Sequence, residues 1–172
     1  MKAAIVLAVL VAIPAAARAD IGVRAGLEAL IASHGSNSGT QVFIGDQTVI
    51  TGDLMLQYWL PADLISIDAE IAEAYDFKAG HHVATTFRPG ITINPPVIPF
   101  YVRGAIPIAF NGYNSAPSIA GLRLGVGTTI GLPIAKIYIE GDVDFPLFGG
   151  TGAPSAFSQQ NLSLGAGVAF RF

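Results

Sequence analysis

Apolar and polar residues alternate one for one along most of the chain that follows Asp20. Between residues 137 and 145, for example, Ile137, Ile139 and Val143 fall on one parity, whereas Glu140 and Asp142 fall on the other. Successive side chains of a β-strand point to opposite faces of a sheet, so a period of two predicts strands with one apolar and one polar face. Because the alternation recurs as far as the last residues, we expect an all-β chain.

Eight segments carry the alternation, and the connections between them are short and long in turn. The predicted strands are residues 21–29, 53–60, 65–71, 86–93, 100–108, 122–130, 137–145 and 162–172. Short turns fall at 61–63, 94–97 and 132–135, and longer loops fall at 33–47, 76–82, 111–115 and 148–161. An even number of strands, with short turns at one end and longer loops at the other, is typical of transmembrane barrels of bacteria.

The composition also indicates a membrane protein. Hydrophobic residues make up 52% of the chain and charged residues 12%, against about 25% charged in a typical soluble domain. The uncharged runs 104–122 and 145–169 are interrupted by proline, glycine and asparagine, so neither predicts a spanning helix. Because the other structure that satisfies its backbone in a bilayer is a closed barrel, we expect a closed antiparallel eight-stranded transmembrane β-barrel. The absence of cysteine excludes disulfides and thiolate metal sites.

The first residues have the pattern of an export signal. Met1-Lys2 precedes an apolar run from Ala3 to Ala17, and Ala17-Arg18-Ala19 matches a signal-peptidase site. We expect a cleaved helical signal peptide at 1–19 and a barrel at 20–172; the alternative is an N-terminal anchor helix. Residues 20–172 keep seven basic and twelve acidic residues, a net charge of −5, which argues against a nucleic-acid partner.

Most charges fall opposite the aliphatic face of the predicted strands. Although each strand's parity was chosen from its aliphatic residues, the three acids of strand 137–145 support the assignment independently. If the aliphatic face meets lipid, the charged face lines the lumen. Five arginines and seven acids then form a lumen charge network: Arg24, Glu28, Asp53, Asp68, Glu70, Arg88, Arg103, Arg123, Glu140, Asp142, Asp144 and Arg171.

A soluble ligand-binding barrel, with an apolar inside and a wet outside, is the structural alternative. Three features favour the membrane: lysine is scarce, the charged face is rich in glycine, and aromatic residues gather near the strand ends, as interfacial girdles do. Toward the short turns lie Tyr58, Trp59, Phe100, Tyr101, Tyr138, Phe170 and Phe172, and toward the long loops lie Tyr75, Phe77, Phe110 and Phe145.

The last residues carry a resemblance to a known family. Gly167, Val168, Phe170 and the terminal Phe172 resemble the C-terminal signal of outer-membrane barrels, although Ala166 stands where the family usually has a polar residue. The whole chain after residue 19 resembles small barrels of the OmpA, OmpX and OmpW types. The resemblance implies an outer-membrane location, contact with outer-membrane lipid, and recognition of the C-terminal strand by the barrel assembly machinery.

The sequence offers little chemistry. His34, His81 and His82 all fall in predicted outer loops, and the nearby serines do not form a nucleophile–base pattern on a strand. We expect no enzyme activity, no cofactor and no metal, and a monomer. The expected function is a non-catalytic barrel with a charge-filled lumen, serving membrane integrity or surface interaction through its outer loops. The alternative is a narrow conduit for small or apolar solutes.

Overall fold

A computed structural model describes residues 20–35, 39–43, 48–60, 64–110, 117–149 and 159–172. The expected signal peptide at 1–19, the turn at 61–63 and the loop at 111–115 lie outside the described residues. The described part contains no helix that is long and apolar enough to cross a membrane.

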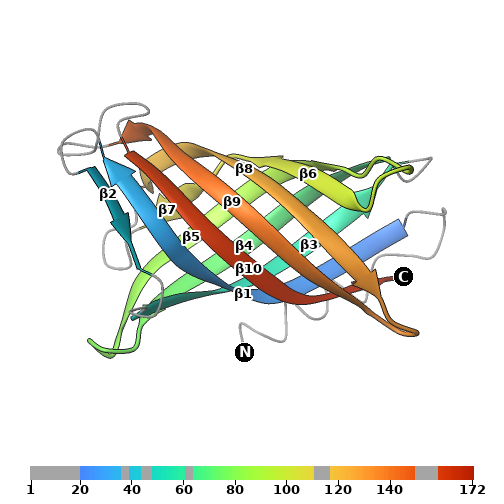
Figure 1. The fold of residues 1–172 in the computed structure, drawn as a ribbon, viewed down its shortest axis with the longest axis horizontal. Helices are drawn as coiled ribbons and strands as arrows, with labels where there is room; N and C mark the ends of the chain where they lie inside the picture. Colours follow the sequence, from blue (N-terminus) through green and yellow to red (C-terminus); the bar gives the residue numbers. More distant parts are fainter. Residues whose placement is uncertain (1–19, 36–38, 44–47, 61–63, 111–116, 150–158) are drawn as a thin grey trace.

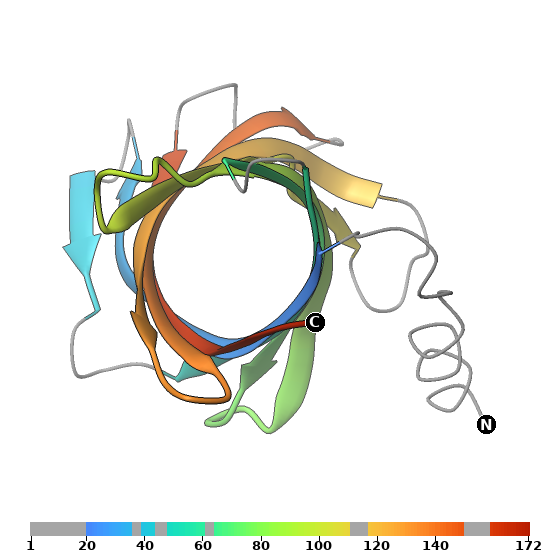
Figure 2. The ribbon, with the colours of Figure 1, turned by 90° about the vertical axis from the view of Figure 1, so that its right-hand side faces the viewer.

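The described residues form ten strands in one antiparallel sheet (Figure 1). They are β1 (Asp20–Gly35), β2 (Gly39–Val42), β3 (Val49–Trp59), β4 (Ile65–Asp76), β5 (His81–Ile93), β6 (Phe100–Ala105), β7 (Ile108–Phe110), β8 (Pro117–Gly131), β9 (Lys136–Gly149) and β10 (Gln159–Arg171). Strand neighbours follow chain order, and β10 also pairs with β1, so the sheet closes into a ring that Figure 2 shows end-on.

The ten strands occupy eight positions around the ring. β6 and β7 both lie between β5 and β8, one beyond the other, and form the two halves of one barrel strand. Pro107 separates them because proline has no N–H to donate to the ladder. Backbone bonds continue across the gap, from Ile106 N to Pro89 O (2.9 Å) and from Gly121 N to Pro107 O (3.0 Å). Likewise, β2 and β3 pair with successive parts of β1. The chain is therefore a closed eight-stranded antiparallel barrel, as expected.

Several strands run further than the sequence predicts. β1 extends to Gly35, β4 reaches Asp76, β5 begins at His81, β9 reaches Gly149 and β10 begins at Gln159. The predicted loops at 33–47, 76–82 and 148–161 are therefore wrong at their edges. Polar and small residues there continue the ladder because each finds a partner on a neighbouring strand. Register shifts at Leu30/Ala32 and Ala74/Tyr75 also interrupt the alternation that would have marked the extensions.

The barrel is apolar outside and charged inside. Arg103 is 2% exposed, and Glu70 and Asp142 are buried to the same degree. Leu124 and Ile139, whose parity is opposite, remain 48% and 43% exposed. This distribution is the reverse of that in a soluble domain, where charged residues are seldom fully buried.

Candidate functional site: the barrel interior

The centre of the lumen is built around Arg103 of β6. Its Nη2 donates to Asp68 Oδ1 at 2.7 Å and its Nη1 donates to Glu70 Oε2 at 2.5 Å, both on β4. Arg88 of β5 reaches the other oxygen of Glu70 at 2.7 Å and Glu28 of β1 at 2.8 Å. Two arginines and three acids from four strands therefore share contacts near the barrel axis.

Arg123 of β8 extends the same cluster toward the long-loop end. Its Nη2 lies 2.7 Å from Glu28 Oε2 and 2.9 Å from Asp142 Oδ2, and its Nη1 lies 2.8 Å from Asp144 Oδ2. One guanidinium thus bridges acids of β1 and β9. Because β8 and β1 stand three positions apart in the ring, with β9 and β10 between them, the contact from Arg123 to Glu28 spans part of the bore.

Arg24 of β1 ends the cluster toward the short turns. Its Nη2 lies 3.1 Å from Glu140 Oε2, and the other oxygen of Glu140 lies 3.8 Å from Arg103 Nη1. These contacts connect ten of the twelve predicted side chains into one ion-pair network: Arg24, Glu28, Asp68, Glu70, Arg88, Arg103, Arg123, Glu140, Asp142 and Asp144.

The other two predicted residues are placed differently. Asp53 accepts a hydrogen bond of 2.9 Å from the Tyr138 hydroxyl. Arg171 lies at the short-turn mouth, where it pairs with Asp20 and its guanidinium carbon stands 5.0 Å from the centroid of the Trp59 ring. Asp20 is not part of the predicted network, and nothing in its sequence position indicates a pairing with Arg171.

The predicted aromatic girdle is wrong at three residues. The parity of Trp59, Tyr101 and Tyr138 places them on the lumen side. Tyr101 and Tyr138 are buried, and the Arg24 guanidinium carbon stands 3.8 Å from the Tyr138 ring centroid and 5.4 Å from that of Tyr101. A cation over an aromatic face is stabilised by the ring quadrupole. These three aromatics therefore complete the interior and do not contribute to the outer girdle.

Glycines on neighbouring strands make room for the two buried tyrosines. A Cβ atom added at Gly26 or Gly167 would collide with Tyr138, and one added at Gly127 would collide with Tyr101. The rings lie where these strands have no side chains. Close packing thus explains why the charged face is rich in glycine. Gly167, a residue of the predicted assembly signal, has such a packing role.

The network leaves little free space. It contains four arginines and six acids, and Asp53 adds a seventh acid nearby. Asp142 Oδ1 and Asp144 Oδ1 find no hydrogen-bond partner among the described residues. A cavity of about 10 Å³ lies between network residues, about the space that one water molecule needs. The described side chains therefore fill most of the space at this level.

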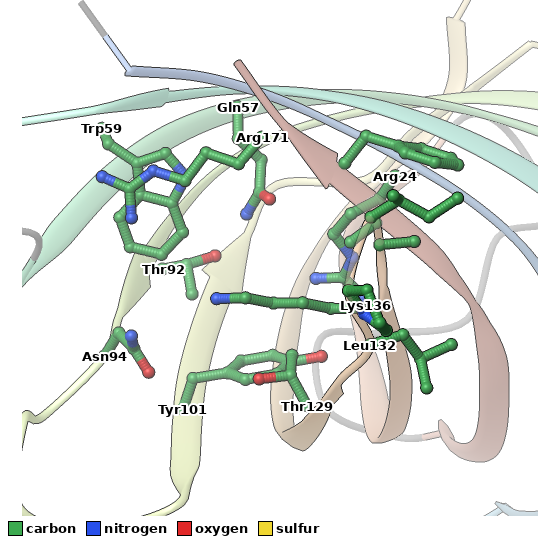
Figure 3. Close-up of a pocket in the computed structure, with 15 residues that line it drawn as sticks. Arg24, Gln57, Trp59, Thr92, Asn94, Tyr101, Thr129, Leu132, Lys136 and Arg171 are labelled. Carbon is green, nitrogen blue, oxygen red and sulfur yellow. The ribbon is translucent and has the colours of Figure 1, made fainter.

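Wider spaces lie at the two ends of the barrel. At the long-loop end, a cavity of about 330 Å³ is lined by Arg88, Asp144 and uncharged residues of β5 to β10. At the short-turn end, a cavity of about 250 Å³ is lined by Arg24, Lys136, Arg171 and uncharged residues (Figure 3). Lys136 directly precedes the predicted strand 137–145, yet it shares the parity of Glu140 and faces this cavity; extending the alternation by one residue finds it.

The prediction that the three histidines lie in outer loops is wrong, since all three lie in strands. On the outward face, His82 Nε2 lies 2.7 Å from Glu73 Oε2 and 3.3 Å from Thr85 Oγ1, and Thr85 also donates to Glu73 at 2.9 Å. A catalytic relay needs the acid and the hydroxyl on opposite ring nitrogens. Because both contact Nε2 here, the cluster does not form one. Among the described residues, no group of three or more histidines and acids could hold a metal.

Together these observations define a class: a small closed β-barrel with an apolar exterior and an interior filled by ion pairs. Among solved structures, the barrel is similar to the crystal structure of Neisserial surface protein A, with a TM-score of 0.56 and 14% sequence identity. The match covers 88% of this chain and 97% of that protein, so the two barrels agree over nearly their whole length. At this identity the likeness is one of fold. No protein-family model and no curated protein matches the sequence.

Proposed function

We propose that the chain is a non-catalytic integral barrel of the outer membrane whose lumen is closed by ion pairs. It serves membrane integrity or surface interaction, and its long-loop end meets the outside. The observation that carries this proposal is the ten-residue ion-pair network across the bore. An eight-stranded barrel is only just wide enough for its own side chains, and here those side chains are paired charges.

The exterior supports a membrane position. Outward aliphatic residues such as Ile67, Ile71 and Val126 are about half exposed. Exposed aromatics flank them, with Tyr58, Phe100 and Phe170 toward the short turns, and with Tyr75 and Phe77 in an edge-to-face pair toward the long loops. An apolar band between two aromatic girdles suits contact with outer-membrane lipid.

The two ends of the chain support the route to that membrane. The signal-like residues 1–19 would direct export. The C-terminal Phe172 lies just beyond the ladder of β1 and β10, where its N–H donates to Ile21 O at 2.9 Å, while its side chain stays 78% exposed. An exposed terminal aromatic on the closing strand is accessible to the barrel assembly machinery while the ring is still open. A monomer suffices, since the described strands leave no long edge to pair with a second copy.

Conductance in planar bilayers tests the closed lumen. The refolded wild-type barrel is expected to show no steady single-channel steps. Arg123→Ala removes the side chain that bridges three acids and should produce measurable leak under the same insertion conditions. Leu124→Ala, which changes only the outer face, is the matched control and should stay silent. Reproducible steps from the wild type would refute the closed lumen and favour the narrow conduit.

A further inference from the structure

The cavity at the short-turn mouth has an unusual lining. Three basic side chains face it, Arg24 from β1, Lys136 from β9 and Arg171 from β10, and no aspartate or glutamate lines it. Figure 3 shows the Lys136 side chain extending across the cavity toward Thr92. Lys136 makes no ion pair with any described residue. Arg24 is paired with Glu140 and Arg171 is paired with Asp20, so Lys136 is the basic group of this mouth whose charge no described acid offsets.

Uncharged donors face the same space. Gln57 is 6% exposed, its side chain makes no hydrogen bond with a described residue, and its amide points into the cavity (Figure 3). The amide opens onto the cavity, where it is available to donate to a polar occupant. Arg24 is similarly buried, and its Nε has no partner among the described residues. Asn94 and Thr129 add further polar groups at the rim.

We infer that this mouth is a binding site for a phosphate group, an activity beyond the closed barrel proposed above. A phosphate carries between one and two negative charges and several acceptor oxygens, which match converging arginine, lysine and amide donors. The volume of about 250 Å³ is several times the roughly 30 Å³ that a water molecule takes in the liquid. It holds a phosphate and part of its ester, for which Trp59 and Tyr101 provide aromatic walls.

The only tryptophan of the sequence lines this cavity, which makes its fluorescence a direct probe. We would titrate the purified barrel, in a phosphate-free detergent, with inorganic phosphate and with glycerol 1-phosphate. Ionic strength is held constant with sodium chloride. The expected result is a saturable change in Trp59 fluorescence that chloride alone does not produce.

Residues 20–172 contain two lysines, which provide a matched pair of variants. Lys136→Gln should weaken phosphate binding about tenfold or more, the usual effect of losing one hydrogen bond to a charged group. Lys136→Arg should keep most of the affinity. Lys78→Gln, at the exposed turn between β4 and β5, should bind as the wild type does. The folded form of each variant is checked by gel mobility before titration.

A second arm distinguishes the source of the phosphate. Saturation by inorganic phosphate or glycerol 1-phosphate indicates a free solute, whereas saturation only by a short-chain phosphatidic acid below its micelle concentration indicates a lipid headgroup. Either result supports the site, provided that Lys136→Gln weakens it. The inference is overturned if no phosphate probe gives a saturable response, if chloride acts equally well, or if Lys136→Gln and Lys78→Gln behave alike.

Discussion

Arg103 is the residue on which the interior most depends. Its side chain is almost fully buried and makes short contacts to Asp68 and Glu70, and its backbone belongs to the short strand β6. Taking such charges out of water is costly, and the cost is offset only while every charge keeps its partners. Removing one member therefore costs more free energy of unfolding than the intact network contributes, because the partners that remain are buried and unpaired.

Arg103→Ala should destabilise the barrel by about 3–5 kcal/mol, because it leaves Asp68 and Glu70 buried without their main partner. The free energy of unfolding is measured by urea titration in lipid vesicles. Asp68→Asn provides the matched partner variant. Combined with Arg103→Ala, it should cost less than the sum of the two single changes, since the neutral amide no longer needs the guanidinium. Simple additivity would contradict direct pairing of these two side chains.

At the scale of the strand, one parity meets the exterior and the other meets the lumen. Leu124 of β8 and Ile139 of β9 point outward, whereas Thr129 of β8 lines the cavity at the short-turn mouth. A shift of one residue in either strand would exchange the two faces, so the pairing register fixes which side chains lie on the exterior.

Leu124→Arg and Ile139→Arg should each cost about 2–4 kcal/mol, the depth-dependent cost of a charge on the lipid face near the midplane. Thr129→Arg should cost less, because its side chain reaches a polar cavity that opens to water. Equilibrium folding into vesicles of defined thickness measures all three. If Thr129→Arg proves worse than both, the faces are assigned the wrong way round and a soluble ligand-binding barrel becomes the better description.

The whole molecule is held by a continuous ladder without disulfides. β1 and β10 pair from Gly22 with Arg171 to Gly35 with Gln159, which joins the two ends of the sheet. Closure leaves the backbone groups paired between strands, and such barrels need no covalent cross-link. The stability of the chain therefore depends on the ring as a unit.

A closed ring predicts heat-modifiable mobility. The folded barrel should migrate differently from the boiled, unfolded chain on a detergent gel, because the ladder resists detergent until it is heated. Removing residues 159–172 deletes β10 and opens the ring, so this truncated form should migrate at one position at every temperature. A single position for the intact chain at all temperatures would count against a closed barrel.

The sequence by itself determined the eight barrel strands in outline, their two faces and most of the charges in the lumen. Side chains of a strand point to alternate faces because of covalent geometry. The alternation of Glu140, Asp142 and Asp144 with aliphatic residues therefore predicts a two-faced strand even when the neighbouring strands are unknown. The same rule placed Arg24, Arg88, Arg103 and Arg123 inside. Proline, asparagine and the short spacings marked the turns at 94–97 and 132–135, which the structure confirms as connections outside the strands.

Only the tertiary structure decided which charges meet and what lies at the mouths. Arg24 and Glu140 are 116 residues apart, and their contact depends on the register and closure of strands that the alternation does not specify. Extensions such as the last residues of β1 form because neighbouring strands supply hydrogen-bond partners, although Ser33, His34 and Gly35 have little strand preference of their own. The basic cavity likewise exists because closure brings Arg24, Lys136 and Arg171 to one rim, since three separate strands end there.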